Sequence, residues 1–399
     1  MKKTVKRILA SLLTVVMLLG AVPMTGITAI AATQSGICGD KLTWTFNTST
    51  GELKIDGTGA MYDYPLVDRP WETYEANIKS VVIGNSVTTI GDYVFDQCGS
   101  LKSVIIGNSV TVIGEGAFRN CDNLKNVTIG NSVTTISRAA FYDCDSLTSV
   151  TIPKSVTAIE NAFESCDSLT SFEVDAANRY YSSDSFGVLY NKNKTELIKY
   201  TIGNSRTSFK IPDSVTAIGV DAFSNSTNLT SVTIPDSVSK IGKYAFNNCS
   251  NLTSITIPYG VTTIGERTFG YCDSLTSVTI PDSVTAIESG VFFVCTGLTD
   301  VYYGGSEKEW DKIEIGEDNI VLNRATIHFK TTDSNAVGDP NNDGKINSSD
   351  ALVCLQHSVG KTQLTGNAFN AGDVDKNGKI NSTDALQILQ YSVGKIEKL

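Results

Sequence analysis

The chain has 399 residues, of which 41% are hydrophobic and 19% are charged, and its formal net charge is −10. A chain of this length forms one elongated domain or two to three compact ones. Its acidity makes it a poor candidate for binding nucleic acid or an anionic membrane, because both are negatively charged themselves.

The N-terminus has the features of a secretory signal peptide. A basic head precedes an apolar run over residues 8–22, and the small residues Ala29 and Ala31 fit a cleavage site. No second apolar run is long enough to cross a bilayer. The sequence therefore predicts a signal peptide over residues 1–31 and a secreted chain without membrane insertion.

Residues 32–77 alternate between apolar and polar side chains. Trp44 and Phe46 lie in one alternating run, Leu53 and Ile55 lie in the next, and a Thr-Gly turn separates the two runs. This pattern predicts a β-hairpin. We expect these residues to form an N-terminal β cap over the next segment of the chain.

A repeat of 23 residues runs through the middle of the chain. Ile106, Ile129 and Ile152 each complete the pattern L-x-x-V-x-I, Ile83 completes a variant that starts at Ile78, and the series resumes at Ile211. A repeat of this kind cannot bury its apolar edge alone, so repeats must stack. The sequence predicts a solenoid of about ten coils over residues 78–303, β-rich with short helical or irregular return segments. One phenylalanine per coil fills its interior: Phe95, Phe118, Phe141, Phe163, Phe223, Phe246, Phe269 and Phe292.

This pattern resembles the BspA-type leucine-rich repeats of bacterial surface proteins. The resemblance implies that residues 32–77 and 304–330 cap the two ends of the solenoid. An insertion over residues 175–205 interrupts the repeat, and its apolar segments around Val188–Tyr190 and Leu197–Tyr200 predict an additional hairpin. Its tyrosines either cover a widened coil or form an adhesive aromatic patch.

Nine cysteines in a secreted chain raise the question of disulfides. Seven of them share one column of the repeat, three residues after the phenylalanine, and Ser226 takes the same place in another coil. A position that serine can fill indicates a small buried residue. Free thiols are the favoured interpretation, with disulfides and a metal site as alternatives. The column contains Cys98, Cys121, Cys144, Cys166, Cys249, Cys272 and Cys295.

The exposed strand positions of the repeat are rich in threonine and serine, as at Thr148, Ser149 and Thr151. Threonine suits an exposed strand position, and a surface of hydroxyl groups also suits a protein or glycan ligand. Both interpretations stay open. A column of aspartates that comes after the cysteines, such as Asp122 and Asp145, either closes turns or holds a cation.

The sequence offers little catalytic chemistry. It contains two histidines, His328 and His357, and both lie outside the repeats that would form a cleft. We therefore predict that the protein is not an enzyme. The alternative is a hydrolase of polysaccharides or peptides with an unrecognised site in the repeat domain, since paired carboxylates can be far apart in sequence.

Two 12-residue segments near the C-terminus, DPNNDGKINSSD at 339–350 and DVDKNGKINSTD at 373–384, carry oxygen-bearing side chains at positions 1, 3, 5, 9 and 12. Position 6 is glycine in both. Ca²⁺ prefers six to eight oxygen ligands, and a loop with this spacing supplies them, including a backbone carbonyl from position 7. The sequence predicts two Ca²⁺ ions, with loop one formed by Asp339, Asn341, Asp343, Lys345, Asn347 and Asp350, and loop two by Asp373, Asp375, Asn377, Lys379, Asn381 and Asp384.

Each loop is followed by one predicted helix, ALVCLQHSVGK or ALQILQYSVGK. This duplicated arrangement over residues 338–399 resembles a type I dockerin, which binds the cohesin modules of a cellulosome scaffold. Residues 331–337 form the predicted linker. Where many dockerins have a Lys-Arg pair, this chain has Leu-Gln. The resemblance implies these cohesin contacts: Ser348, Ser349, Leu355, Gln356, Ser382, Thr383, Leu389 and Gln390.

The sequence thus predicts a secreted interaction or adhesion protein without catalytic activity. Its dockerin would bind a cohesin on a scaffold or cell surface when Ca²⁺ is present, and its solenoid would present a surface to an unidentified protein or glycan. The rival hypothesis is a cellulosomal enzyme, because dockerins usually carry catalysts.

Overall fold

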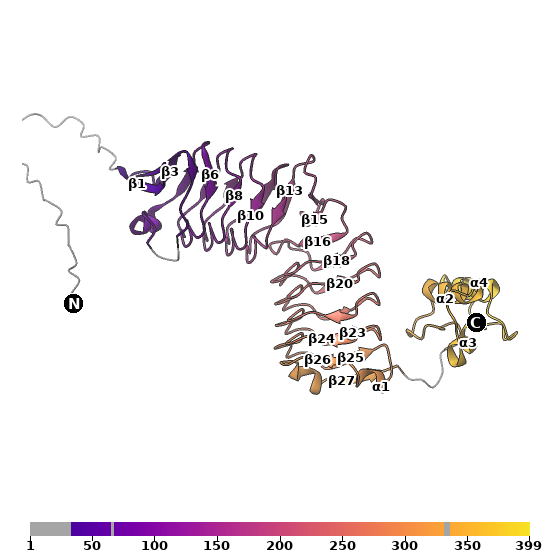
Figure 1. The fold of residues 1–399 in the computed structure, drawn as a ribbon. Helices are drawn as coiled ribbons and strands as arrows, with labels where there is room; N and C mark the ends of the chain where they lie inside the picture. Colours follow the sequence, from indigo (N-terminus) through magenta and orange to yellow (C-terminus); the bar gives the residue numbers. More distant parts are fainter. Residues whose placement is uncertain (1–32, 65–67, 331–335) are drawn as a thin grey trace, which may run out of the picture.

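The computed structural model describes residues 33–64, 68–330 and 336–399. Figure 1 shows a bent solenoid and then a small helical segment at the C-terminus. The predicted signal peptide lies outside the described residues. Within the described part of the chain, no helix is both long and apolar enough to cross a membrane.

An antiparallel sheet covers the first coil. It contains β1 (Thr33–Gly39), β2 (Leu42–Asn47) and β3 (Glu52–Gly57). Trp44 lies opposite Ile55 and Phe46 lies opposite Leu53, and all four side chains are buried. The alternation in the sequence therefore places one face of the hairpin on the core. β3 also pairs in parallel with β5 (Ser80–Ile83) of the first coil, and the connection contains β4 (Gly59–Ala60) and the 3-10 helix η1 (Glu72–Asn77).

One strand per coil lines one face of the solenoid. Most neighbouring strands pair in parallel and in register. Ser80 pairs with Ser103 and Ser103 pairs with Asn126, so these steps equal the 23-residue period. The structure has eleven such strands in its described residues, because a strand of the C-terminal cap extends the column beyond the ten coils predicted. They are β5 (Ser80–Ile83), β7 (Ser103–Ile105), β9 (Asn126–Thr128), β11 (Ser149–Ile152), β13 (Ser171–Val174), β17 (Ser208–Lys210), β19 (Ser231–Thr233), β21 (Ser254–Thr256), β23 (Ser277–Ile280), β25 (Asp300–Tyr303) and β27 (Thr326–Phe329).

A second column of shorter strands lies after the turn of each coil. The remaining chain of each coil consists of turns and bends, so the return segments are irregular. The short strands are β6 (Val87–Ile90), β8 (Val112–Ile113), β10 (Thr135–Ile136), β12 (Ala158–Ile159), β18 (Ala217–Ile218), β20 (Lys240–Ile241), β22 (Thr263–Ile264), β24 (Ala286–Ile287) and β26 (Glu314–Ile315).

The phenylalanine column forms stacks of parallel rings inside the solenoid. Phe118 stacks on Phe95 and Phe141 with ring centroids 5.1 and 5.3 Å apart. The cysteine column lies beside it, and every cysteine of the chain is a free, buried thiol. Each column cysteine from Cys121 onward donates a weak hydrogen bond to the previous coil, as Cys144 Sγ does to the carbonyl of Phe118 at 3.2 Å. These thiols are therefore packed core residues.

The insertion divides the solenoid into two hydrophobic cores. It forms an antiparallel sheet of β14 (Tyr181–Ser183), β15 (Leu189–Asn191) and β16 (Glu196–Lys199), and β16 pairs in parallel with β18 of the next coil. Tyr190 and Tyr200 are buried, whereas Tyr180 is exposed, so most of the aromatic surface covers the widened coil. β13 and β16 lie at the bend of the solenoid in Figure 1.

The C-terminal cap and the segment beyond it contain the helices. The cap includes α1 (Glu307–Trp310) and the 3-10 helix η2 (Ile320–Asn323), and the final segment includes α2 (Ser348–Ser358), α3 (Gly366–Gly372) and α4 (Ser382–Ser392). The sequence analysis predicted α2 and α4 but not α3, whose sequence GNAFNAG has poor helix propensity. Packing holds α3, because Ala371 is buried and Phe369 packs on the core formed with α2 and α4.

Candidate metal loops and binding surfaces

Both 12-residue segments fold back onto their own first aspartate. In loop one, the backbone N–H groups of Asp343 and Gly344 donate to the carboxylate of Asp339 at 3.0 and 2.9 Å. In loop two, Asn377 and Gly378 donate to Asp373 at 3.0 and 2.8 Å. Gly344 and Gly378 have φ angles of +77° and +80°, which side chains other than glycine rarely adopt. The glycine at position 6 therefore permits the turn.

The last residue of each loop is also fixed in place. Asp350 accepts a hydrogen bond from the backbone N–H of Asn347, and Asp384 accepts one from Asn381, each at 3.0 Å. The side chains of Asn347 and Asn381 cap α2 and α4 by accepting from Ser349 and Thr383. The same residues thus start each helix and bring the twelfth position back to the first.

Carboxylate oxygens converge at one point in each loop. Those of Asp339, Asp343 and Asp350 lie within 4.8 Å of one another, and so do those of Asp373, Asp375 and Asp384. In the described chain, no other three potential metal-ligating residues converge in this way. The aspartate column of the solenoid therefore forms no such cluster. Converging carboxylates repel one another unless a cation lies between them.

Asp350 is the clearest sign that loop one fits a cation. It is fully buried, and its Oδ1 has no hydrogen-bond partner. Burial raises the pKa of Asp350 to about 6, and the charges of Asp343 and Asp339 add to this effect. A buried carboxylate oxygen without a donor is costly. The donor set of oxygens without nitrogen or sulfur fits Ca²⁺.

Lys330 at the end of the solenoid cap reaches loop one, a contact that the sequence analysis did not predict. Its Nζ donates to the carbonyl of Asn341. Burial lowers the pKa of Lys330, and the charges of Asp282, Asp339 and other carboxylates oppose this shift. No local sequence signal identifies such a contact, because it depends on how the cap and the loop meet.

The eight predicted cohesin contacts all lie on α2 and α4. Six of their side chains are exposed, and Gln356 and Gln390 are half-buried. Further exposed apolar residues, which the sequence did not indicate, lie beside them. They are Leu352 in α2 and Val359 directly after that helix, and Leu386 in α4 and Val393 directly after that helix. Their exposed fractions are 54%, 67%, 53% and 66%. With Leu355 and Leu389 they form one apolar stripe on each helix, spaced as neighbours on one helical face.

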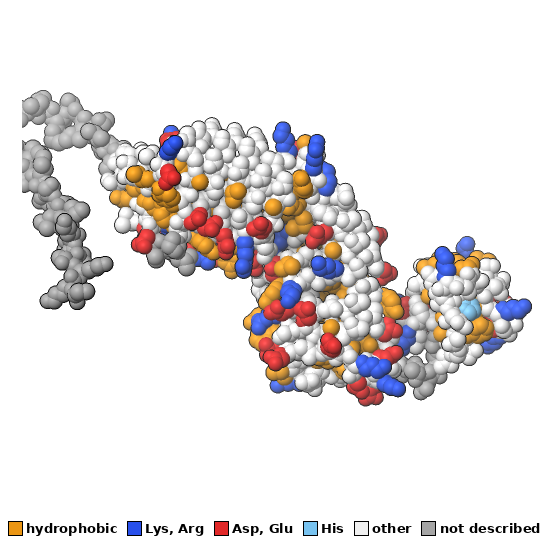
Figure 2. Space-filling model, in the orientation of Figure 1, with side chains coloured by type: hydrophobic (Ala, Val, Ile, Leu, Met, Phe, Trp, Pro, Cys, Tyr) orange, Lys and Arg blue, Asp and Glu red, His pale blue; other side chains and the backbone are white. Residues whose placement is uncertain are grey.

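Adjacent faces of these two helices form the small core. Ala351 and Cys354 of α2 pack with Ala385 and Ile388 of α4. The apolar stripes are therefore not part of that core. Figure 2 shows hydrophobic side chains gathered on the outside of the helical segment where Figure 1 places α2 and α4.

Threonine hydroxyls on the strand face of the solenoid are used inside the fold. Thr253 Oγ1 donates to the carbonyl of Thr230, and Thr276 Oγ1 donates to that of Thr253, each at 3.1 Å. The same contact recurs between other coils, as from Thr299 to Thr276. From Thr148 onward, the threonines of this column therefore join neighbouring coils, which favours the structural interpretation for this column.

The two histidines differ in their surroundings. His357 accepts a hydrogen bond at Nδ1 from the backbone N–H of Leu364, so it fixes the turn after α2. His328 lies on the exposed strand face, with Nε2 2.7 Å from Asp300 Oδ1 and its ring stacked on Tyr302. Neither contact involves a serine or cysteine nucleophile.

A solenoid whose coils each carry an L-x-x-V-x-I strand segment places the chain in the class of leucine-rich-repeat proteins. The family model described as the BspA type leucine rich repeat region matches residues 73–192 and 200–313, more than half of the chain, so the chain belongs to this family. The model of the type I dockerin domain matches residues 337–391. Both resemblances drawn from the sequence are thus confirmed.

Solved structures agree with this assignment. A leucine-rich repeat protein from Eubacterium ventriosum is 27% identical with a TM-score of 0.57, and the match covers 68% of this chain and 84% of that protein. The pneumococcal vaccine antigen PcpA shares the fold at 21% identity and a TM-score of 0.54, over 78% of this chain and 91% of its own. No curated protein matches the chain.

Proposed function

We propose that this protein is a secreted, non-catalytic docking protein. Its helices α2 and α4 bind a cohesin on a cellulosome scaffold or cell surface when Ca²⁺ is present, and its solenoid presents a surface to a protein or glycan. The observation that carries the proposal is the duplicated unit at the C-terminus, in which each carboxylate loop leads directly into a helix with an exposed apolar stripe.

The proposed ligands of each ion follow the loop geometry. Asp339, Asp343 and Asp350 supply carboxylate oxygens in loop one, and Asn341 and the carbonyl of Lys345 complete the set, with Asn347 acting through water. Loop two uses Asp373, Asp375, Asn377, Lys379, Asn381 and Asp384 in the same order. Bound Ca²⁺ neutralises the negative charge of the clustered carboxylates. Ion binding therefore contributes free energy to the folding of this small core.

Removing the first ligand of both loops tests the proposal. We expect the double variant Asp339→Ala and Asp373→Ala to lose the heat of Ca²⁺ binding in calorimetry and to lose calcium-dependent binding to cohesin modules. The matched control is Lys345→Ala with Lys379→Ala, because these positions offer only a backbone carbonyl and their side chains are exposed. Calcium-dependent cohesin binding by the aspartate variant would refute the assignment.

The proposed role of the solenoid rests on its extended, exposed strand face. Serine and threonine side chains such as Ser231 and Thr256 remain exposed there between the hydroxyls that join the coils. Figure 2 shows neutral side chains and backbone over most of the visible surface of the coils. Binding of the full chain to cell-wall polysaccharides and to host surface proteins tests this role. Turnover of a polysaccharide or peptide by the chain would instead support the enzyme hypothesis.

A further inference from the structure

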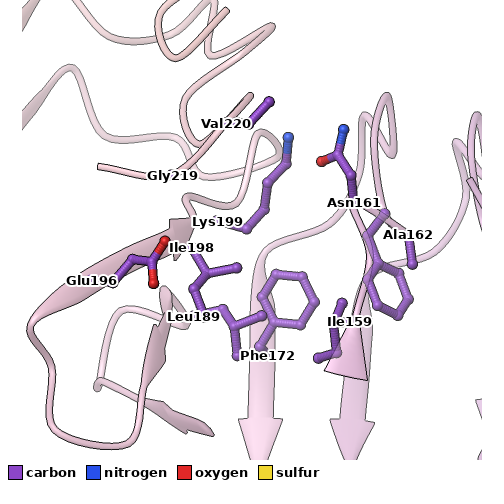
Figure 3. Close-up of a pocket in the computed structure, with 11 residues that line it drawn as sticks. Ile159, Asn161, Ala162, Phe172, Leu189, Glu196, Ile198, Lys199, Gly219 and Val220 are labelled. Atoms are coloured by element: carbon purple, nitrogen blue, oxygen red, sulfur yellow. The ribbon is translucent and has the colours of Figure 1, made fainter. Parts of the chain in front are cut away.

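A cavity of about 170 Å³ lies where the insertion separates the two cores (Figure 3). The aromatic column is interrupted at this place. Phe163 ends the first stack and meets Phe172 edge-on, with ring centroids 5.4 Å apart, and Tyr200 begins the second stack on Phe223. No ring contact in the described residues joins Phe163 to Tyr200. The cavity is thus lined by the last aromatic residues of the first stack.

The cavity is mainly apolar and open to solvent on one side. Val220 and Glu196 belong to its lining and are exposed, so a small molecule can enter. A dry apolar cavity of about 150 Å³ in another protein binds benzene, so this volume suits one six-membered ring. The apolar walls are formed by Ile159, Ala162, Phe163, Phe172, Leu189 and Ile198.

One polar residue at the cavity departs from the repeat. Lys199 directly precedes Tyr200 and so occupies the position that precedes the aromatic residue in each coil. Other coils have a small or β-branched residue there, such as Ala117, Ala140 and Ala222. A buried lysine is costly, and Lys199 is 6% exposed. Packing of the solenoid therefore does not explain a lysine at this position.

The Lys199 ammonium has N–H donors that form no hydrogen bond within the described residues. Its Nζ donates to the backbone carbonyl of Asp221 at 2.8 Å, the one hydrogen bond that it makes within the described residues. An ammonium group has three donors. Figure 3 shows the ends of Lys199 and Asn161 on the same side of the cavity, with Phe172 and Leu189 below them.

The charges around Lys199 determine whether a neutral or a charged ligand fits the cavity. The carboxylate of Asp221 lies near Lys199 and accepts a hydrogen bond from Asn161 Nδ2 at 2.9 Å, and Glu164 is a further negative neighbour of both residues. Glu196 adds a carboxylate to the lining. The positive charge of Lys199 is therefore already balanced. An anionic ligand would be repelled, whereas a neutral oxygen can accept a hydrogen bond without adding charge.

We propose that this cavity binds one neutral, single-ring aromatic molecule that carries a hydroxyl group, of the phenol class. The ring lies against Phe163 and Phe172, at the distances that aromatic pairs favour. The hydroxyl oxygen accepts a hydrogen bond from Lys199 Nζ.

Titration of the full chain with phenol, benzene and benzoate by calorimetry and ligand-observed NMR tests the proposal. Phenol saturates one site, and benzoate binds at least tenfold more weakly. Lys199→Met keeps the aliphatic stem but removes the donor, and it weakens phenol binding roughly tenfold while leaving benzene binding unchanged. Equal affinity of the wild type and this variant for phenol would overturn the role of Lys199.

A second pair of variants locates the site without altering buried residues. Val220→Trp fills the open side of the cavity from an exposed position and abolishes phenol binding. Lys243→Trp places the same side chain at the equivalent position one coil later, away from the cavity, and leaves binding unchanged. The proposal fails if phenol gives no saturable signal, or if Val220→Trp binds it as the wild type does.

Discussion

Asn161 donates a hydrogen bond from Nδ2 to Asp221 Oδ2 at 2.9 Å, although the two residues are 60 positions apart in the chain. Side-chain hydrogen bonds between neighbouring coils elsewhere span about one repeat, as from Asn248 to Asn225. A second bond of the same span joins Asn225 to Ser165. Both bonds cross the insertion, so side chains join the two halves of the solenoid where the regular ladder is interrupted.

Removal of Asn161 should weaken this junction more than it weakens either half. We expect Asn161→Ala to lose about 1–2 kcal/mol of unfolding free energy, and to separate urea unfolding into two transitions because each half has its own core. Asn251→Ala is the matched control, since its bond to the carbonyl of Thr227 lies within the second half. Hydrogen exchange of the backbone amides in each half shows which half unfolds in which transition. A single transition in Asn161→Ala, as cooperative as in the control, would contradict the prediction.

Asp221 should make the stability of the solenoid depend on pH. Burial, followed by the charge of Glu164, raises the pKa of Asp221 to about 6, against the opposing effects of Lys199 and Asn161. The folded state therefore binds the proton more tightly than the unfolded state, whose pKa is about 3.9. The resulting stabilisation is complete below pH about 4 and is lost as the pH rises through about 6.

Comparison with Asp221→Asn isolates this effect. Between pH 4 and pH 7, the unfolding free energy of the wild type should fall by about 2–3 kcal/mol relative to that of the variant. Urea titrations at four pH values over this range measure the difference. A difference that stays constant across the range would show that Asp221 has a normal pKa.

The buried thiols should resist modification until the chain unfolds. Burial raises the pKa of Cys166 and of Cys249 to about 12, so almost no reactive thiolate exists near pH 8. We expect an aromatic disulfide reagent to find no reactive cysteine in the native chain and nine after denaturation without reductant. Fewer than nine would reveal a disulfide, the alternative that the column spacing left open.

The sequence predicted those parts of the protein that repeat or that lie within a short segment. Phe118 and Cys144 belong to columns with a fixed period, and the period alone places them in the core. The meeting of the carboxylates in each 12-residue loop could be predicted for a related reason. Asp339 and Asp350 are only 11 positions apart, and Gly344 shows that the backbone turns sharply between them.

The features that the sequence did not reveal depend on contacts between distant segments. Lys199 could have been noticed as a departure from the alanines of its column, but only the meeting of the two cores places it beside a cavity. α3 forms in a segment of poor propensity because Phe369 packs on the core that α2 and α4 share. The contact of Lys330 with loop one likewise depends on the placement of the cap.

The two apolar stripes offer the last prediction, because they are equivalent in sequence and in exposure. Leu352 and Leu386 are 54% and 53% exposed and lie at the same place on α2 and α4. In the proposed docking mode, either helix would present the same face to a cohesin. We expect Leu352→Asp alone, or Leu386→Asp alone, to reduce affinity only about twofold, since one of two equivalent sites remains. The double variant should lose binding by at least a hundredfold, because each charge would be buried without a partner. Calorimetry with Ca²⁺ provides the control, since neither leucine lies in a loop and ion binding should be unchanged. If one single variant abolished cohesin binding while the other had no effect, only one helix would be the docking surface.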